Sequence, residues 1–531
     1  MGKVLRFAAF LLAAAAVAAG CSGPDSREEN TSATPGWQRT ADTPVTLSWY
    51  INFSWFTSTW DDSLVARTIT EETGAELHFI TPSGNEWEKL NSMMASDTLP
   101  DFVTLGHWEP QVNQMIADGQ VLALNQLADT YDPYFWEVAH PQRVAWYTMP
   151  DGNLYAYPNS SYAPSDYEQY NNIGANQAFL VRRDIYEGLG SPDMTTPEGF
   201  IQAVRNAAAQ YGSLDGQPLI PIGLYDFDKD GCYSLEAILM NLLAVPFERD
   251  GAAYDRYTDP DYITWLKAFR QLCHEGYFPA DIFVDRRLQT AEKVADGRYF
   301  CMLYQHTDIA DQQKVVYEKY PGCQYIAVDG PKNAAGDPHT LPGVGINGWT
   351  VTLVGNNCKT PDRAIQLLSY LISEHGQLTT YCGVEGVTYD KVDGIPVIRP
   401  DVLALLNRDR VEYNRLYAAD NTYWMLQDLA MQQQWQPEQH PPLDQPRQWT
   451  YPYTIYTGQY ETTYAIGSEE ANIHGKIREE WGRTLPQLLM ADSDETFDRL
   501  LDSFCRKRDA LGFALVQKEA TRQMAAAKDR L

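Results

Sequence analysis

Short runs of strand-forming residues alternate with helix-forming segments along the part of the chain that follows Pro44. β-branched and aromatic side chains predict the strands, and amphipathic periodicity predicts the helices. The predicted strands are residues 45–50, 75–80 and 101–105, and the predicted helices between them are 61–73 and 85–96. Strands joined by helices of this length predict an α/β fold with a mostly parallel sheet and right-handed crossovers. In such open sheets, ligands bind beyond the carboxyl ends of the strands.

The loops at those carboxyl ends are aromatic. Residues 52–60 follow the first predicted strand and residues 106–108 follow the third, and both loops carry tryptophan. The whole chain has 33 Tyr and 14 Trp against 18 Phe. Tyr and Trp combine a flat apolar face with a polar group, which suits ligands that present C–H faces and hydroxyls, as sugars do. Most of these aromatic residues are nevertheless expected to serve the core or the surface.

Length and charge narrow the class of protein further. A chain of 531 residues is longer than one core usually needs, so two or more lobes are expected. The formal net charge of −29 repels phosphate backbones, which argues against a nucleic-acid partner. No segment after the N-terminal one approaches the ~20 apolar residues of a membrane-crossing helix.

The N-terminal segment has the layout of a secretory signal. Lys3 and Arg6 precede an apolar run over residues 7–17, and Ala18-Ala19-Gly20-Cys21 follows. The small residues before Cys21 resemble a bacterial lipobox, which implies cleavage after residue 20 and lipidation of Cys21. The alternative is an ordinary secretory signal with a cysteine at the cut by chance. Residues 21–43, rich in Ser, Thr, Gly, Pro and charge, predict a flexible linker.

Two further features concern the second half of the chain. Residues 437–452 hold five prolines in sixteen positions, which predicts a surface loop or a ligand-facing excursion rather than a regular helix. Residues 494–531 predict a helical tail. Seven cysteines remain after Cys21 and no CxxC pair occurs, so mostly reduced, buried thiols are expected, with one disulfide left open.

Five motifs together carry a family resemblance. They are Thr98-Leu99-Pro100-Asp101-Phe102-Val103, Asp151-Gly152-Asn153-Leu154-Tyr155-Ala156-Tyr157-Pro158, Leu180-Val181-Arg182-Arg183-Asp184, Glu292-Lys293-Val294-Ala295-Asp296-Gly297-Arg298, and the stretch from Gly348-Trp349 to Cys382-Gly383-Val384-Glu385-Gly386-Val387. In this order, and with the lipobox, they make the chain similar to extracellular solute-binding lipoproteins of ABC importers. The similarity is to the carbohydrate-binding group, which includes maltose-, oligosaccharide- and alginate-binding members.

The resemblance implies a fold of two α/β lobes that close on a ligand about a hinge. Each lobe would be a mostly parallel sheet flanked by helices, and the C-terminal part would be a helical extension. Carried onto this sequence, the first lobe is expected over residues 44–159 and 349–400. The second lobe is expected over residues 162–342 and 401–531.

The candidate ligand-binding residues lie where this topology places loops at the cleft between the lobes. Each supplies either a ring face or a planar polar group for a sugar. They are Trp55, Trp108 and Glu109 from the first lobe, Tyr157, Asn159 and Tyr162 from the crossover, Tyr225, Tyr304, Gln305 and His306 from the second lobe, and Trp349 and Glu385 from the return segment. Packing within a lobe is the competing interpretation for Trp349.

Asp226, Asp228, Asp230 and Gly231 match the first half of an EF-hand calcium loop. The twelfth position, where a bidentate Glu belongs, is Ala237, and Glu236 comes one place early. An acidic surface turn is therefore the favoured interpretation, and calcium is the weaker one. No cofactor is expected, because the nine His show no paired zinc spacing.

The predicted function is capture of an oligosaccharide or related solute, without catalysis, and its delivery to ABC permease subunits. The protein is expected to be a monomer on the extracytoplasmic face of the cell membrane, held by its lipid alone. One alternative is a surface glycoside hydrolase, which needs two carboxylates about 5–10 Å apart at a sugar site. Another is a binding protein for a peptide or other non-sugar solute.

Overall fold

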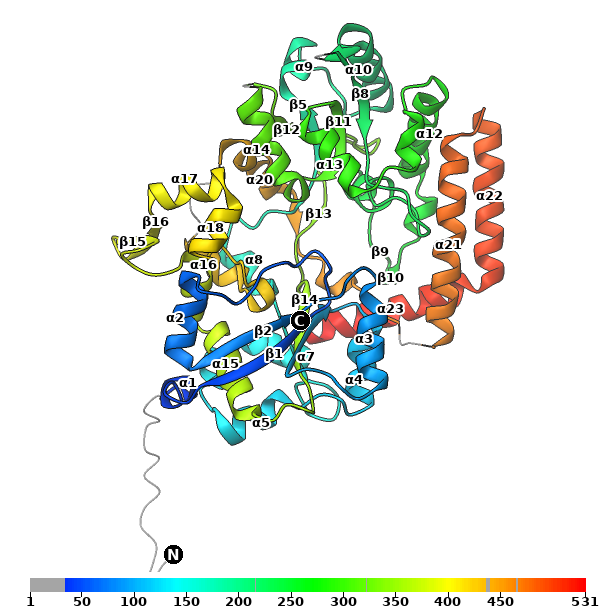
Figure 1. Ribbon diagram of the computed structural model, residues 1–531. Coiled ribbons are helices and arrows are strands. Elements are labelled where there is room, and N and C mark those ends of the chain that lie inside the picture. The colour runs from blue at the N-terminus through cyan, green and yellow to red at the C-terminus, as the bar shows by residue number, and fades with distance from the viewer. Residues whose placement is uncertain (1–33, 215, 321, 436–439, 465–466) are drawn as a thin grey trace, which may run out of the picture.

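The computed structural model describes residues 34–214, 216–320, 322–435, 440–464 and 467–531 (Figure 1). The predicted signal peptide, Cys21 and most of the predicted linker lie outside these residues. The chain forms two bodies, each built around its own sheet and its own hydrophobic core. The predicted α/β fold with two lobes is therefore confirmed.

The first lobe contains a five-stranded sheet in the order β2-β1-β3-β14-β4. β1 (Val45–Ile51), β2 (Ala75–Ile80) and β3 (Phe102–Gly106) run parallel, as the sequence predicts. β14 (Thr350–Val354) returns antiparallel to β3, and β4 (Ala156–Pro158) pairs with β14. Since β14 starts where β3 ends, the residues before Thr350 lie at the same sheet edge as the loops after β1 and β3.

Helices cover both faces of this sheet. α2 (Leu64–Thr73) ends at Gly74, which has a φ of +69°, and Asn85 caps α3 (Glu86–Ala95) through its side chain. Further helices of the lobe are α4 (Pro110–Ala117), α5 (Leu124–Tyr131), α7 (Pro141–Tyr147), α15 (Pro361–Ile372) and α16 (Glu374–Cys382). α15 is the most deeply buried, because its apolar stripe faces the core that Trp49 and Phe102 share.

The second lobe contains a four-stranded sheet in the order β12-β5-β11-β8. β11 (Tyr299–Gln305) runs parallel to β8 (Ile220–Gly223) and antiparallel to β5 (Gln177–Arg182), which pairs with β12 (Tyr325–Ala327). The helices α10 (Pro197–Gln210) and α12 (Pro260–His274) pack on it. α21 (Glu469–Leu489) and α22 (Asp494–Leu511) join the same core through Trp481 and Phe504, and α23 (Phe513–Arg530) completes the predicted helical tail.

The connections between the lobes include the segment after β4 and the segment after β12. A further connection runs through β17 (Thr454–Ile455), which follows a helix on the second sheet and leads to Glu461 beside His107 of the first lobe. β13 (Leu341–Pro342), in the segment after β12, pairs in parallel with β17, so these two connections are joined by backbone hydrogen bonds (Figure 1). This short pair is the candidate hinge.

The structure corrects two of the expected boundaries. Residues 402–426, expected in the second lobe, belong to the first, because Val402, Tyr413 and Trp424 pack into the core of the first sheet. The predicted linker is too long, because α1 (Gly36–Arg39) buries Trp37 in that same core.

The proline-rich segment is also corrected. α20 (Pro441–Thr450) is helical because two of its prolines occupy the first turn, where an amide hydrogen has no helical partner. Gln445 of this helix pairs with both backbone groups of Ala327 at 2.8 and 2.9 Å, which extends the edge of the second sheet. Among the described residues, no helix combines the length and the apolar character needed to cross a membrane.

Candidate functional site

Phe53, Trp55, Trp349 and Trp424 gather at the carboxyl end of β1 and β3, and we call this group the tryptophan platform. The rings of Trp55 and Trp349 are nearly parallel, with centroids 6.0 Å apart and an interplanar angle of 7°. Trp424 lies 4.5 Å from Trp349 and 5.6 Å from Trp55. Trp55 is 55% exposed although Trp424 beneath it is buried. The platform therefore offers a broad ring face to solvent from a rigid base.

Asn159 holds the base of the platform in place. Its side-chain amide donates to the backbone oxygen of Trp424 at 3.0 Å and accepts from the backbone N–H of Thr350 at 2.8 Å. Its backbone oxygen also accepts from the N–H of Trp349 at 3.2 Å. One fully buried side chain thus joins the crossover, the return strand and the segment around residue 424.

The neighbouring loop after β3 adds a second exposed indole and one carboxyl group, and Glu461, from the segment after β17, adds another. Trp108 is 49% exposed, and its ring covers Gly106, where an added Cβ would lie 2.7 Å from the ring. Glu109 precedes the first residue of α4, and burial raises the pKa of its carboxyl to about 7. His107 lies 3.7 Å from Glu461, and burial lowers the pKa of this imidazole to about 4. Burial also raises the pKa of Glu461 to about 7.

Tyr225, Tyr233 and Tyr304 gather at the carboxyl ends of β8 and β11, and we call this group the tyrosine platform. The rings of Tyr225 and Tyr304 are stacked with centroids 3.8 Å apart and an interplanar angle of 4°. Tyr233 meets Tyr225 edge-on at 5.4 Å and is 41% exposed. The second lobe thus has its own ring surface at the equivalent sheet edge.

Polar groups surround the tyrosine platform. The hydroxyl of Tyr225 donates to Asp308 at 2.6 Å and to the side-chain oxygen of Gln305 at 3.2 Å. Gln305 in turn donates to the hydroxyl of Tyr233 at 3.3 Å. Amide and carboxylate groups beside a ring face are the combination that sugar hydroxyls require, since each neutral hydrogen bond contributes only about 1 kcal/mol and several must converge.

The structure brings seven of the twelve predicted ligand-binding residues to these two sheet edges. Each has an exposed or half-buried side chain there, apart from Tyr304, which lies beneath Tyr225. They are Trp55, Trp108, Glu109 and Trp349 in the first lobe, and Tyr225, Tyr304 and Gln305 in the second.

Four predicted residues are buried and have partners within the protein. Tyr157 accepts from the N–H of His140 at 3.1 Å, and Tyr162 accepts from Gln433 at 3.1 Å. The ring Nε2 of His306 contacts the backbone oxygen of Ala175 at 3.1 Å, and Asn159 supports the tryptophan platform. Their side chains position the hinge and the sheets, which corrects the expectation that they face a ligand.

Glu385 is misplaced as well. It lies at the base of the hairpin of β15 (Tyr389–Val392) and β16 (Ile395–Ile398), which projects from the outer side of the first lobe (Figure 1). There it is exposed and forms an ion pair with Lys391 at 3.0 Å.

Several residues of the two edges were not predicted. Asp308 and Tyr233 stand within three and eight positions of the predicted Gln305 and Tyr225, so a wider search around those residues would include them. Trp424 and Glu461 are far along the chain from their partners, and only the fold brings them to the first sheet.

The carboxylates of the acidic turn at residues 226–231 already have partners within the protein. Asp228 accepts from the backbone N–H groups of Asp230 and Gly231 at 2.7 and 3.0 Å. Glu236 points to the buried indole N–H of Trp481, at 2.6 Å, and accepts from the N–H of Cys232. Asp226 faces Arg286 at 3.8 Å. Within the described ranges, no three His, Cys, Asp or Glu side chains are grouped as a metal site would need.

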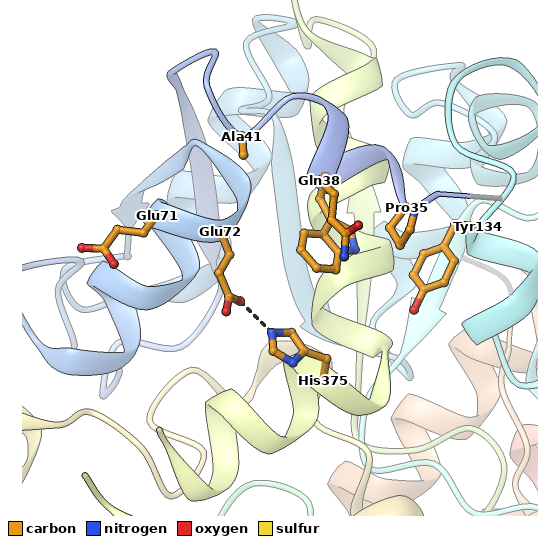
Figure 2. Close-up of a pocket in the computed structure, with 8 residues that line it drawn as sticks. Pro35, Gln38, Ala41, Glu71, Glu72, Tyr134 and His375 are labelled. Carbon is orange, nitrogen blue, oxygen red and sulfur yellow. Dashed lines mark hydrogen bonds and ion pairs between the residues drawn. The ribbon is translucent and has the colours of Figure 1, made fainter. Parts of the chain in front are cut away.

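A separate pocket of about 630 Å³ lies on the outside of the first lobe, between α1, α2 and α16 (Figure 2). The imidazole Nε2 of His375 donates to the carboxylate of Glu72 at 2.8 Å, and the ring of Trp37 stacks on His375 with centroids 5.9 Å apart. The carboxylate of Glu72 also accepts from Tyr370 at 2.5 Å. These contacts attach α1 to the lobe, away from both platforms.

Comparison with known proteins shows the fold. No family model and no curated protein matches the chain. Several solved structures have a similar fold. One of them is an alginate-binding protein without calcium ion, which shares 19% identity and a TM-score of 0.66 over 91% of this chain and 98% of that chain. An HMO-binding, ABC-transporter-associated solute-binding protein from Bifidobacterium longum infantis shares 15% identity and a TM-score of 0.67, over 91% of this chain and 99% of that chain.

A third match is an ABC-transporter substrate-binding protein of Streptococcus pneumoniae in complex with kestose. It shares 14% identity, with a TM-score of 0.68 over 92% of this chain and 100% of that chain. The chain therefore has the fold of ABC-transporter solute-binding proteins over nearly its whole described length.

Proposed function

We propose that this chain is the solute-binding component of an ABC importer. It captures an oligosaccharide between the tryptophan platform and the tyrosine platform and releases it unchanged to a membrane permease. The observation that carries this proposal is the pair of ring surfaces, one at the ligand-binding edge of each sheet. The matched proteins named as binding alginate, HMO and kestose support the same class of ligand.

The proposed mechanism is closure about the hinge. Sugar C–H faces lie against Trp55 and Tyr225, and the hydroxyls bond Gln305 and the acidic groups beside the rings. A ligand that touches both lobes only in the closed state shifts the population toward closure. The two paired crossings at β13 and β17 give the motion a defined axis.

Binding is tested with the purified mature chain and a panel of neutral and acidic oligosaccharides and peptides. A ligand raises the melting temperature because it binds the native state alone. We expect oligosaccharides to raise it and peptides to leave it unchanged. A response to peptides alone would overturn the sugar assignment.

The site is tested with Trp55→Ala and Tyr225→Ala. Burying a large aromatic face contributes about 1.5–3 kcal/mol, so each change is expected to weaken binding at least tenfold by calorimetry. Trp136→Ala is the matched control, because Trp136 is 42% exposed but packs on Phe135 away from both platforms. Equal losses in all three variants would contradict the assignment of the site.

Release of an unchanged ligand separates this function from a glycoside hydrolase. The bound oligosaccharide is incubated with the protein and recovered, and we expect the same chain length by mass spectrometry. Shortened products that vanish in Glu109→Gln or Glu461→Gln would favour the enzyme instead.

We further propose that Cys21 carries the lipid that holds the protein on the extracytoplasmic face of the membrane, as a monomer. Labelling of cells with a radioactive fatty acid is expected to mark the wild type and not Cys21→Ser. Light scattering on the mature chain measures the oligomeric state.

A further inference from the structure

Carboxyl groups stand beside both ring surfaces. Glu109 and Glu461 accompany Trp108 and His107 at the first lobe, and Asp308 accompanies Tyr225 at the second. A carboxylate only accepts hydrogen bonds, so it pairs with sugar hydroxyls and repels a sugar carboxylate. The charge balance around these three groups therefore bears on which oligosaccharides the site admits.

Glu109 has a like charge for a neighbour. Its carboxyl bonds the Trp108 side chain, and the nearby charge acting on it is that of Glu86, which Ser54 fixes through its N–H at 2.8 Å and its hydroxyl at 3.1 Å. Among the described residues, no Lys or Arg forms an ion pair with Glu109. The negative charge of Glu109 therefore has no positive partner in this part of the structure.

Glu461 is bonded by neutral groups. Asn347 donates to it at 2.6 Å, and Asn347 is itself held by the indole N–H of Trp146 at 2.6 Å. The other neighbour is the imidazole of His107, which burial keeps uncharged at neutral pH because its pKa is lowered to about 4. In the part of the chain that the structure describes, this carboxylate therefore also has no Lys or Arg partner.

Asp308 differs from Glu109 and Glu461 because a guanidinium lies near its carboxylate. It accepts from the hydroxyl of Tyr225 at 2.6 Å, and the guanidinium of Arg287 lies 3.7 Å away. The Arg287 side chain is 68% exposed, so solvent screens its charge. The second lobe thus adds a hydroxyl-bonding acid rather than a cationic pocket.

Resting on the proposed function, we infer that this site selects uncharged oligosaccharides and excludes chains of uronic acids, with Glu109 and Glu461 as the residues that determine the specificity. The backbone N–H of His107 bonds the backbone oxygen of Trp349 at 3.3 Å, so the loop that carries Glu109 lies next to the tryptophan platform. A uronate bound there would bring its carboxylate towards Glu109 and Glu461, with no cation to separate the charges. An uncharged sugar would meet the same groups as hydrogen-bond acceptors. A site for a chain of uronic acids would need cationic side chains at this edge, and among the described residues no Lys or Arg forms an ion pair with Glu109 or Glu461.

The test compares matched pairs of ligands that differ at C6. Manno-oligosaccharides are paired with mannuronate oligomers, and galacto-oligosaccharides with galacturonate oligomers, by calorimetry at pH 8 and low salt. We expect a neutral chain to bind and its acidic counterpart to bind at least tenfold more weakly. Equal or tighter binding of the acidic chain overturns this inference and leaves the proposed function standing. No binding by any oligosaccharide overturns the proposed function itself.

Variants assign the effect to the named residues. The double change Glu109→Gln with Glu461→Gln keeps the side-chain size and one acceptor oxygen and removes both charges, so the ratio of neutral to acidic affinity is expected to fall at least tenfold. Glu385→Gln, on the distant hairpin, is the matched control and is expected to keep the wild-type ratio. An unchanged ratio in a double variant that melts as the wild type does would overturn the assignment.

Acidification gives an independent readout. Lowering the pH from 8 to 5.5 protonates Glu109 and Glu461, while a uronate remains ionised. In the wild type, the ratio of the affinity for the neutral chain to that for the acidic chain is expected to fall at pH 5.5. In the double variant, this ratio is expected to stay constant. A ratio that is independent of pH in the wild type would contradict the inference.

Discussion

The guanidinium of Arg530, near the end of α23, lies 4.3 Å from the centroid of the Trp146 ring in α7 of the first lobe. The same guanidinium donates to the backbone oxygen of Trp146. α23 packs on α21 of the second lobe, so this helix bridges both lobes outside the hinge. Trp146 also donates to Asn347, which links the contact to Glu461 at the ligand-binding edge.

Arg530→Ala is expected to loosen the connection between the lobes. An exposed cation–π contact contributes about 0.5–1 kcal/mol, so the free energy of unfolding should change little while the ligand-free radius of gyration in X-ray scattering increases. The control is Arg522→Ala on the same helix, whose partner Glu519 is only three residues away. An identical scattering profile for both variants would refute a bridging role for α23.

Asn159→Ala is expected to cost about 2–3 kcal/mol of unfolding free energy, because it leaves a buried N–H and a buried carbonyl unpaired. Since the tryptophan platform rests on these bonds, ligand affinity should fall as well, although Asn159 touches no solvent. Denaturant unfolding and calorimetry measure the two effects. Gln202→Ala on the exposed face of α10 is expected to change neither.

Glu461→Gln is expected to stabilise the protein at alkaline pH. Burial raises the pKa of Glu461 to about 7, so the native state holds this proton where the unfolded chain, with a value near 4.5, has lost it. Stability therefore declines as the pH rises from about 4.5 to 7, and removing the charge should flatten that decline. After allowance for partial exposure, a gain of about 1–2 kcal/mol at pH 8 is expected from denaturant unfolding. A loss of stability at pH 8 would show that the charged form is compensated.

The Glu72–His375 pair is expected to stabilise the attachment of α1 within a limited pH range. Its partner raises the pKa of His375, so that contribution is lost as the pH rises through the raised value. Bonds from His375 and Tyr370 lower the pKa of Glu72 against the opposing effect of burial, so its contribution is lost as the pH falls through the lowered value. A double-mutant cycle should give a coupling of about 0.5 kcal/mol at pH 6 and none at pH 9. Equal coupling at both values would mean that the bond does not depend on charge.

Part of the site could be predicted because its residues follow strands directly. Trp55 and Trp108 come after β1 and β3, and Tyr225 and Gln305 come after or at the end of β8 and β11. Parallel strands end at a common edge, so local sequence is enough to place such residues near a ligand. The same rule misplaced Tyr157, Asn159 and His306, because position relative to a strand does not say whether a side chain points into the protein.

Periodicity and residue type were enough to predict the strand and helix order of the first sheet and the aromatic character of its loops, because both act over short distances along the chain. The two lobes followed from the chain length and from the family resemblance. The tertiary structure alone decided that Trp424 completes the tryptophan platform, that residues 402–426 join the first lobe, and that Glu461 reaches His107. Those contacts join residues more than seventy positions apart. Their partners are chosen by packing and by the need to pair buried polar groups, and neither leaves a pattern in neighbouring residues.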